Sequence, residues 1–193
     1  DKFSLANVQT GNYAAFLPLP SPIGTIVIPR QWAPVDVTLH GKSFRLISTH
    51  LESYDGPPVG TNLRMAQALE LLQIANASPS PVVLMGDLNA ELDTVGDASW
   101  FLTAQGGFAD VWSNSQNDGP GFTCCQDPSL RVPDSLLHER IDFIMTRGDF
   151  GVINAHLVGT EWIADPADPA MPVLWASDHA GVVAKLFLPL GAD

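Results

Sequence analysis

Four short motifs carry the residues whose types and spacing are most informative about chemistry. They are Thr49-His50-Leu51-Glu52, Gly86-Asp87-Leu88-Asn89, Arg140-Ile141-Asp142 and Ser177-Asp178-His179. Each motif ends or follows an apolar, β-prone run, so we expect its polar groups at a strand end, and strand ends converge on one rim of a sheet. The candidate site residues are His50, Asp87, Asn89, Asp142, Asp178 and His179. Two imidazoles, three carboxylates and an amide suit metal-assisted cleavage of a phosphate ester.

The pair Asp87 and Asn89 is spaced so that both side chains point the same way along an extended segment. Asp87 could orient or deprotonate an attacking water, while Asn89 donates a hydrogen bond to a phosphoryl oxygen. The alternative is that Gly-Asp-x-Asn forms only a turn after a strand.

The adjacent residues Asp178 and His179 precede an apolar strand expected over 180–188. On a loop they can converge, and the Asp178 carboxylate can bind a hard divalent cation. We predict that His179 shares this metal site and serves as a base or as a charged donor to phosphate. The alternative is that the motif only caps the strand.

Asp142 lies in an otherwise apolar strand, where a carboxylate without a partner is costly to bury. Its partner is either a histidine, whose tautomer it would fix, or Arg140 two residues away. His50 ends another strand and could donate a proton to a leaving alkoxide, or be a structural histidine. Glu52 would share the face of His50.

Composition favours one well-packed domain over residues 1–193. Hydrophobic residues make up 46% and charged residues 16%, so the chain can bury a sizeable core. The net charge is −12, and the nine Lys and Arg form no cluster. A broad nucleic-acid-binding face normally shows clustered basic residues, although a bound divalent metal can supply positive charge locally.

The expected elements indicate an α/β (or α+β) fold with a mixed sheet. We predict helices over 62–76 and 97–105, the first with an apolar face formed by Leu63, Ala66, Leu69 and Leu72. Residues 161–172 are expected to be a loop. Strands are expected over 13–18, 24–28, 35–39, 44–51, 81–85, 140–146, 151–159 and 180–188.

The adjacent cysteines Cys124 and Cys125 leave three readings open, of which buried thiols are favoured over a vicinal disulfide or pairing with another chain. No apolar run approaches the ~20 residues needed to span a bilayer. The chain starts at Asp1 without a Met or an apolar leader, which suggests a processed, trimmed or partial chain. Few Lys, many Pro and Gly and the cysteine pair favour a secreted or periplasmic protein.

Taken together and in this order, the four motifs resemble the endonuclease/exonuclease/phosphatase (DNase I-like) superfamily over about residues 33–188. The stretch Gly121-Phe122-Thr123-Cys124-Cys125-Gln126 resembles a bacterial, exported branch of it. The resemblance implies a four-layer α/β/β/α sandwich and a Mg²⁺ or Mn²⁺ cofactor. It also implies a role for each motif residue: His50 contacts phosphate and assists the leaving group, Asp87 positions the water, Asn89 binds phosphate, Asp142 supports His179, and Asp178 joins the metal site.

The chain departs from this family in its N-terminal part. Members carry an N-terminal half with an Asn or Asp on the first strand and a metal-binding Glu in a Gln-Glu motif, and no such motif is found here. The chain therefore resembles the C-terminal part of the domain, and an open sheet edge could pair with a second chain or form a homodimer.

Two functions of different classes follow from this sequence. The first is a metal-dependent phosphoester hydrolase (a phosphodiesterase, nuclease or phosphatase), and the second is a catalytically silent binding or assembly module. A serine esterase is disfavoured because no Gly-x-Ser-x-Gly elbow is present.

Overall fold

The computed structural model describes residues 3–54, 63–165, 167, 170 and 173–189. Its helices are α1 (Leu63–Asn76) and α2 (Ala98–Ala104). Its strands are β1 (Phe3–Ala6), β2 (Gly11–Asn12), β3 (Leu17–Ser21), β4 (Gly24–Ile28), β5 (Gln31–Leu39), β6 (Lys42–His50), β7 (Val82–Asp87), β8 (Ala109–Asp110), β9 (Asp142–Arg147), β10 (Gly151–Val158), β11 (Ile163–Ala164), β12 (Val173–Leu174) and β13 (Gly181–Phe187).

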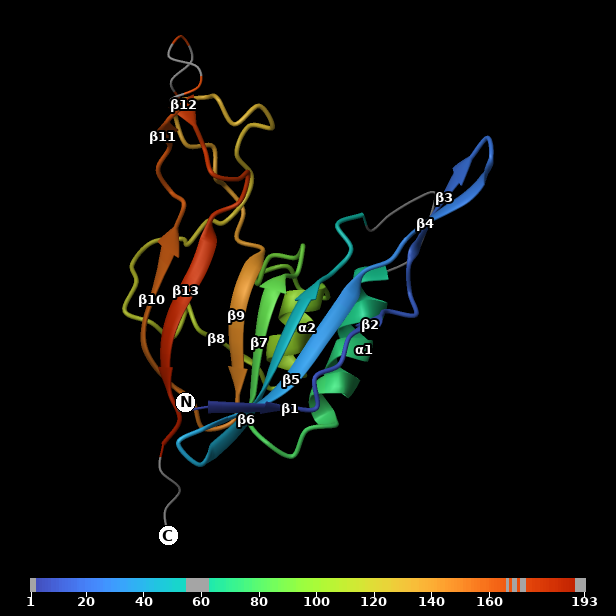
Figure 1. Ribbon diagram of the computed structural model, residues 1–193, viewed down its shortest axis with the longest axis vertical. Coiled ribbons are helices and arrows are strands. Elements are labelled where there is room, and N and C mark those ends of the chain that lie inside the picture. The colour runs from blue at the N-terminus through green and yellow to red at the C-terminus, as the bar shows by residue number, and fades with distance from the viewer. Residues whose placement is uncertain (1–2, 55–62, 166, 168–169, 171–172, 190–193) are drawn as a thin grey trace.

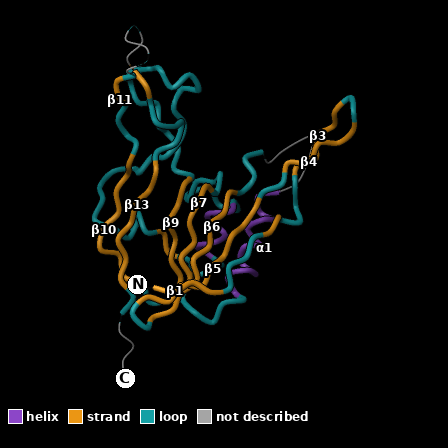
Figure 2. Tube along the Cα trace, viewed as in Figure 1, coloured by secondary structure: helices purple, strands orange, loops and turns teal. Residues whose placement is uncertain are grey.

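A seven-stranded mixed sheet forms the centre of the molecule. Its strand order is β1-β5-β6-β7-β9-β8, and β2 pairs with β5 outside this path. The two helices lie against one face, while the β10–β13 ribbon lies beside β9 (Figure 1). Figure 2 shows the same arrangement, with the helices grouped behind β5, β6 and β7. The mixed α/β fold is therefore confirmed, and the two sheets form part of the expected sandwich.

Two sequence expectations differ from the structure, and a third lies outside the described residues. The first strand of the 13–28 region runs from Leu17 to Ser21 rather than over 13–18, because it pairs with Gly24–Ile28 in a hairpin. Part of the expected 161–172 loop forms the short pairing of β11 with β12. Two-residue strands are too short to show an alternating pattern. The expected helix start at residue 62 lies outside the described residues.

The buried face of α1 also differs from the expected one. The helix buries Gln67, Ala68, Leu71 and Ala75, whereas Leu69 is 47% exposed. Leucine and alanine occur on both sides of this helix, so periodicity alone could not choose the face. Ala68, Leu71 and Ala75 pack with Ile47, Leu84 and Met145 of the sheet in one core cluster. No helix among the described residues is long and apolar enough to span a membrane.

Gly86 allows β6 and β7 to approach closely just before the site. Its φ is +142°, and a Cβ added there would lie 1.8 Å from the carbonyl oxygen of Thr49 on β6. Only glycine fits this conformation and this spacing.

We therefore expect Gly86→Ala to lower the free energy of unfolding by at least about 2 kcal/mol, because it adds a backbone clash to an unfavourable φ. Chemical denaturation measures this change. Gly24→Ala is the matched control, since Gly24 has a φ of +129° but nothing within 4 Å of an added Cβ. Equal losses in the two variants would contradict the close-approach argument.

A second prediction concerns the ion pair between β5 and β6. Arg45 donates to Asp36 through Nε at 2.7 Å and Nη2 at 3.0 Å, and these bonds hold the pKa of Asp36 below its usual value. A lowered folded-state pKa stabilises the protein above the unfolded pKa, and this stabilisation is lost as the pH falls through the folded value. Asp36→Asn should cost about 0.5–1 kcal/mol at pH 7, and the difference from the parent should shrink below about pH 3.9. Thermal or urea unfolding across this range measures it, and an unchanged difference at acid pH would contradict the assignment.

Candidate active site

Three of the predicted site residues form a row across neighbouring strands. His50 at the end of β6 is paired in register with Asp87 at the end of β7, and Asp87 is paired with Asp142 at the start of β9. Residues paired in this way project to the same face of a sheet. His50 Nε2 lies 3.3 Å from Asp87 Oδ2. The strand register therefore brings three groups far apart in sequence to one rim.

His179 joins this row from the loop before β13. Its Nδ1 lies 2.8 Å from Asp142 Oδ2. Of the two partners expected for Asp142, the structure has the histidine, because Arg140 instead donates to Asp110 Oδ2 at 2.8 Å. A carboxylate bonded to Nδ1 orients the ring and leaves Nε2 for another partner.

A segment over residues 123–126 fastens the strand of Asp142 to the loop of His179. Thr123 Oγ1 accepts hydrogen bonds from the backbone N–H groups of Ile141 (3.2 Å) and Asp142 (3.1 Å). The Thr123 carbonyl accepts from Ala180 N at 2.7 Å, and Gln126 N donates to the carbonyl of Asp178 at 2.9 Å. Thr123 is fully buried. Sequence reasoning assigned no role to Thr123, although the stretch 121–126 was part of the family resemblance.

The cysteines of this segment are bonded to each other. Cys124 and Cys125 form a disulfide between neighbours in sequence, so the favoured expectation of buried thiols is wrong and the vicinal alternative holds. Sequence could not decide this, because adjacency permits both states. The backbone of Cys124 also pairs with Glu139.

Asn89 follows Asp87 in a tight turn. Its φ is +48°, and its backbone N–H donates to Asp87 Oδ1 at 2.7 Å. Its side-chain Nδ2 donates to the carbonyl of Leu51 at 2.9 Å. The turn alternative is thus present, and it fixes Asn89 beside Asp87 at the end of β7. One N–H of the Asn89 side chain is therefore used in a hydrogen bond within the fold. The predicted contact of Asn89 with phosphate stays a prediction.

Arg30 is a rim residue that sequence reasoning missed. Its Nη1 lies 3.1 Å from His50 Nε2, and its Nη2 lies 3.2 Å from Oε1 of the buried Glu52. Burial raises the pKa of Glu52, but the hydrogen bonds from Arg30 and from backbone N–H groups outweigh it, so the pKa is lowered. Glu52 thus anchors a guanidinium next to His50. No local motif marks Arg30, because only the pairing of β5 with β6 brings it there.

The pKa values of three site residues are shifted by burial and by one another's charges. Burial, followed by the charge of Asp142, raises the pKa of Asp87. Burial lowers the pKa of His50, and the nearby Arg30 acts in the same direction. For His179 burial acts downward, but the hydrogen bond and charge of Asp142 outweigh it and raise the pKa. The two histidines therefore differ in the direction of their shifts, which is the arrangement that separates acid and base roles.

A divalent cation would find suitable donors in this row. Asp87, Asp142 and His179 each offer a ligand atom, and these atoms lie within 4.8 Å of one another. Two carboxylates and one imidazole suit Mn²⁺ or Mg²⁺. Asp178 is not part of this cluster: its side chain is exposed and accepts from Ser177 Oγ at 3.2 Å. His179 thus lies beside two further candidate ligands and Asp178 does not, and the metal roles of both residues stay predictions.

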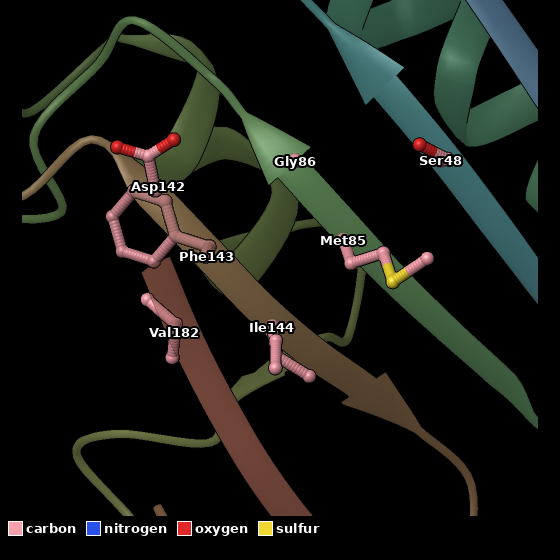
Figure 3. A pocket seen from close by; sticks show the side chains of 7 residues that line it. All are labelled: Ser48, Met85, Gly86, Asp142, Phe143, Ile144 and Val182. Atoms are coloured by element: carbon pink, nitrogen blue, oxygen red, sulfur yellow. The ribbon is translucent and has the colours of Figure 1, made fainter. Parts of the chain in front are cut away.

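A pocket lies between the central sheet and β13 next to this row. Figure 3 shows its lining, in which the Asp142 carboxylate points away from the apolar side chains of Met85, Ile144 and Val182. The volume is about 270 Å³. The row thus stands at the polar end of a largely apolar hollow between the two sheets.

The chain belongs to the endonuclease/exonuclease/phosphatase family, whose model matches residues 17–179. No curated protein matches the chain. Among solved structures, the mannosyl-6-phosphatase Bt3783 of Bacteroides thetaiotaomicron is similar, with 17% identity and a TM-score of 0.72 over 97% of this chain and 68% of that one. An endonuclease/exonuclease/phosphatase family protein of the same organism has 18% identity and a TM-score of 0.74 over 96% of this chain and 64% of its own.

A third similar structure is the TDP2 of D. rerio complexed with a single-strand DNA product. It has 18% identity and a TM-score of 0.64, over 97% of this chain and 69% of its own. At these identities the likeness shows the fold alone. The chain spans about two thirds of the length of these structures.

The bond between Asp142 and His179 gives a direct spectroscopic prediction. Asp142→Asn removes the charge that holds the His179 pKa up, so we expect the pKa of this ring to fall. An NMR titration of the histidine rings in the presence of chelator measures it. Asp149→Asn, in the bend between β9 and β10, is the control and should leave the His179 titration unchanged. A His179 pKa that does not move in Asp142→Asn would contradict the assigned contact.

Proposed function

We propose that this chain forms the catalytic part of a divalent-metal-dependent phosphoester hydrolase. The observation that supports this is the row of His50, Asp87 and Asp142, joined by His179, at the rim of the sheet. Members of the family include phosphoester hydrolases, and these groups are the ones that water attack on phosphorus requires.

The proposed roles follow from the contacts. Asp87, with Oδ2 3.3 Å from His50 Nε2 at the rim, would position and deprotonate the attacking water. Asn89 binds a phosphoryl oxygen, and His50 contacts phosphate and assists the leaving group. Asp142 orients His179, which faces phosphate through its Nε2.

Asp178 would hold Mg²⁺ or Mn²⁺ with Asp87 and Asp142, and His179 would join them only in place of its phosphate contact, since Asp142 leaves it one ring nitrogen, Nε2. When bound, the cation would supply positive charge that stabilises the charge developing on phosphate. The guanidinium of Arg30, held by Glu52 beside His50, adds a fixed positive charge at the same rim.

The comparisons favour no single substrate, because the similar structures include a sugar-phosphate phosphatase and a DNA-bound protein. The net charge of −12 disfavours long duplex DNA and favours small phosphoesters or lipid headgroups. The disulfide supports a secreted or periplasmic location, since such bonds persist in oxidising compartments.

We further propose that a second chain or a homodimer completes the sandwich. The observation that supports this is the face of the sheet opposite the helices, which exposes Phe3, Leu5 and Leu39. The alternative to an active enzyme is a catalytically silent binding or assembly module.

Turnover assays distinguish the two functions. Hydrolysis of a generic phosphodiester and a generic phosphomonoester should require Mg²⁺ or Mn²⁺ and stop with chelator. Asp87→Ala and His179→Ala should each lower the rate about 10²–10⁴-fold, since each removes a group that transfers or positions a proton. Asp149→Ala, remote from the row, is the control and should keep the parent rate. A folded sample without metal-dependent turnover would favour the silent module.

A further inference from the structure

The β3–β4 hairpin is an uncharged arm that projects from the molecule. Residues 14–29 contain no Asp, Glu, Lys, Arg or His. In Figures 1 and 2 the hairpin extends away from the sheet, at the end toward which β6 and β7 run and where the row of site residues lies. Its exposed large apolar side chains are those of Phe16, Leu19, Ile23, Ile26, Val27 and Ile28. Ile23, at the tip, is 94% exposed.

The hairpin is apolar on both of its faces. Leu19 is paired with Ile26 and the buried Leu17 with Ile28, so one face carries four aliphatic side chains, three of them exposed. The other face carries Pro18 opposite Val27 and Pro20 opposite Thr25. A surface ribbon normally has one polar face, and a ribbon that is apolar on both faces requires an apolar environment.

The edge of β3 offers few donors to another strand. Ser21 and Gly24 close a two-residue turn, and such a closing pair exchanges backbone hydrogen bonds. Hydrogen-bonded positions alternate along the ladder, so Pro18 and Pro20 occupy the outward-facing positions. Proline has no N–H, so this edge cannot accept a partner strand by regular pairing. The same feature removes two backbone donors that would resist transfer into an apolar medium.

We propose that the β3–β4 hairpin inserts its tip into the interfacial region of a lipid bilayer and so holds the rim of the sheet near the membrane surface. A bilayer accepts aliphatic groups on both faces of a ribbon and needs no strand pairing, whereas a protein interface normally has a polar rim, and residues 14–29 carry no charged side chain to match one. Ser21 Oγ donates to the Gly24 carbonyl at 2.6 Å, which satisfies a polar group at the tip internally.

The charge of the chain specifies the kind of bilayer. A net charge of −12 opposes approach to anionic lipids, and the arm contributes no positive charge to offset it. The expected partner is therefore a bilayer without net charge, bound through apolar contact and insensitive to salt. This interaction does not depend on catalysis and can be tested separately from the proposed hydrolase activity.

Co-sedimentation with phosphatidylcholine vesicles tests the proposal. The chain should carry Asp87→Ala, so that hydrolysis does not alter the vesicles. We expect binding that is unchanged between low and high salt. Ile23→Ser should weaken it about tenfold, because one large aliphatic side chain no longer leaves water. Adding Ile26→Ser should weaken it further.

Leu69→Ser is the matched control, because Leu69 is also a large aliphatic residue exposed to solvent, but on α1. This variant should leave vesicle binding unchanged. Ile23 lies in the turn and outside the core cluster, and its variant should keep the parent unfolding transition.

Absence of vesicle binding by the parent would overturn the proposal, as would equal losses in Ile23→Ser and Leu69→Ser. Binding that grows with anionic lipid and falls with salt would also overturn it. So would self-association without vesicles that Ile23→Ser abolishes, because the arm would then contact a second copy of the chain.

Discussion

The register of three adjacent strands is the constraint on which the site depends. The parallel pairing of β6 with β7 and the antiparallel pairing of β7 with β9 bring His50, Asp87 and Asp142 into one row. A shift of one residue would turn any of these side chains to the helix-covered face. Gly86 lets β6 and β7 approach closely at the residue before Asp87. The packing of α1 against Ile47 and Leu84 determines which face of the sheet is covered by the helices and which face carries the row. The arrangement of the row is thus a consequence of packing some distance from it.

The second constraint is the segment over residues 123–126, which holds the two members of the Asp142–His179 pair from both sides. Strand pairing places Asp142, but His179 lies on a loop whose position is free unless something fastens it. The bonds of Thr123 to Asp142 N and to Ala180 N connect both backbones to one buried residue. A hydrogen bond at 2.8 Å between two side chains 37 residues apart follows from this backbone arrangement. Preorganisation of this kind avoids the cost of ordering the pair when substrate binds.

Sequence reasoning found most of the row because strand ends can be recognised locally. An apolar run followed by His50, by Asp87 or by the 177–179 motif marks a position at the edge of a sheet. It could not find Arg30, which reaches His50 only through the pairing of β5 with β6, nor could it see that Thr123 fastens two distant backbones. It also chose the wrong face of α1, since alanine and leucine occupy both sides and tertiary packing decides between them. For the adjacent cysteines it favoured buried thiols over a vicinal disulfide or pairing with another chain, and the structure has the vicinal disulfide.

A double-mutant cycle between Asp142 and His179 tests the central claim that these two residues act as one unit. The rate of metal-dependent phosphoester hydrolysis would be measured for Asp142→Asn, for His179→Ala and for the double variant. If Asp142 acts through His179, its substitution should have little further effect once the imidazole is gone, so the double variant should match His179→Ala. Losses that simply multiply would show that the two residues act independently and would contradict the account.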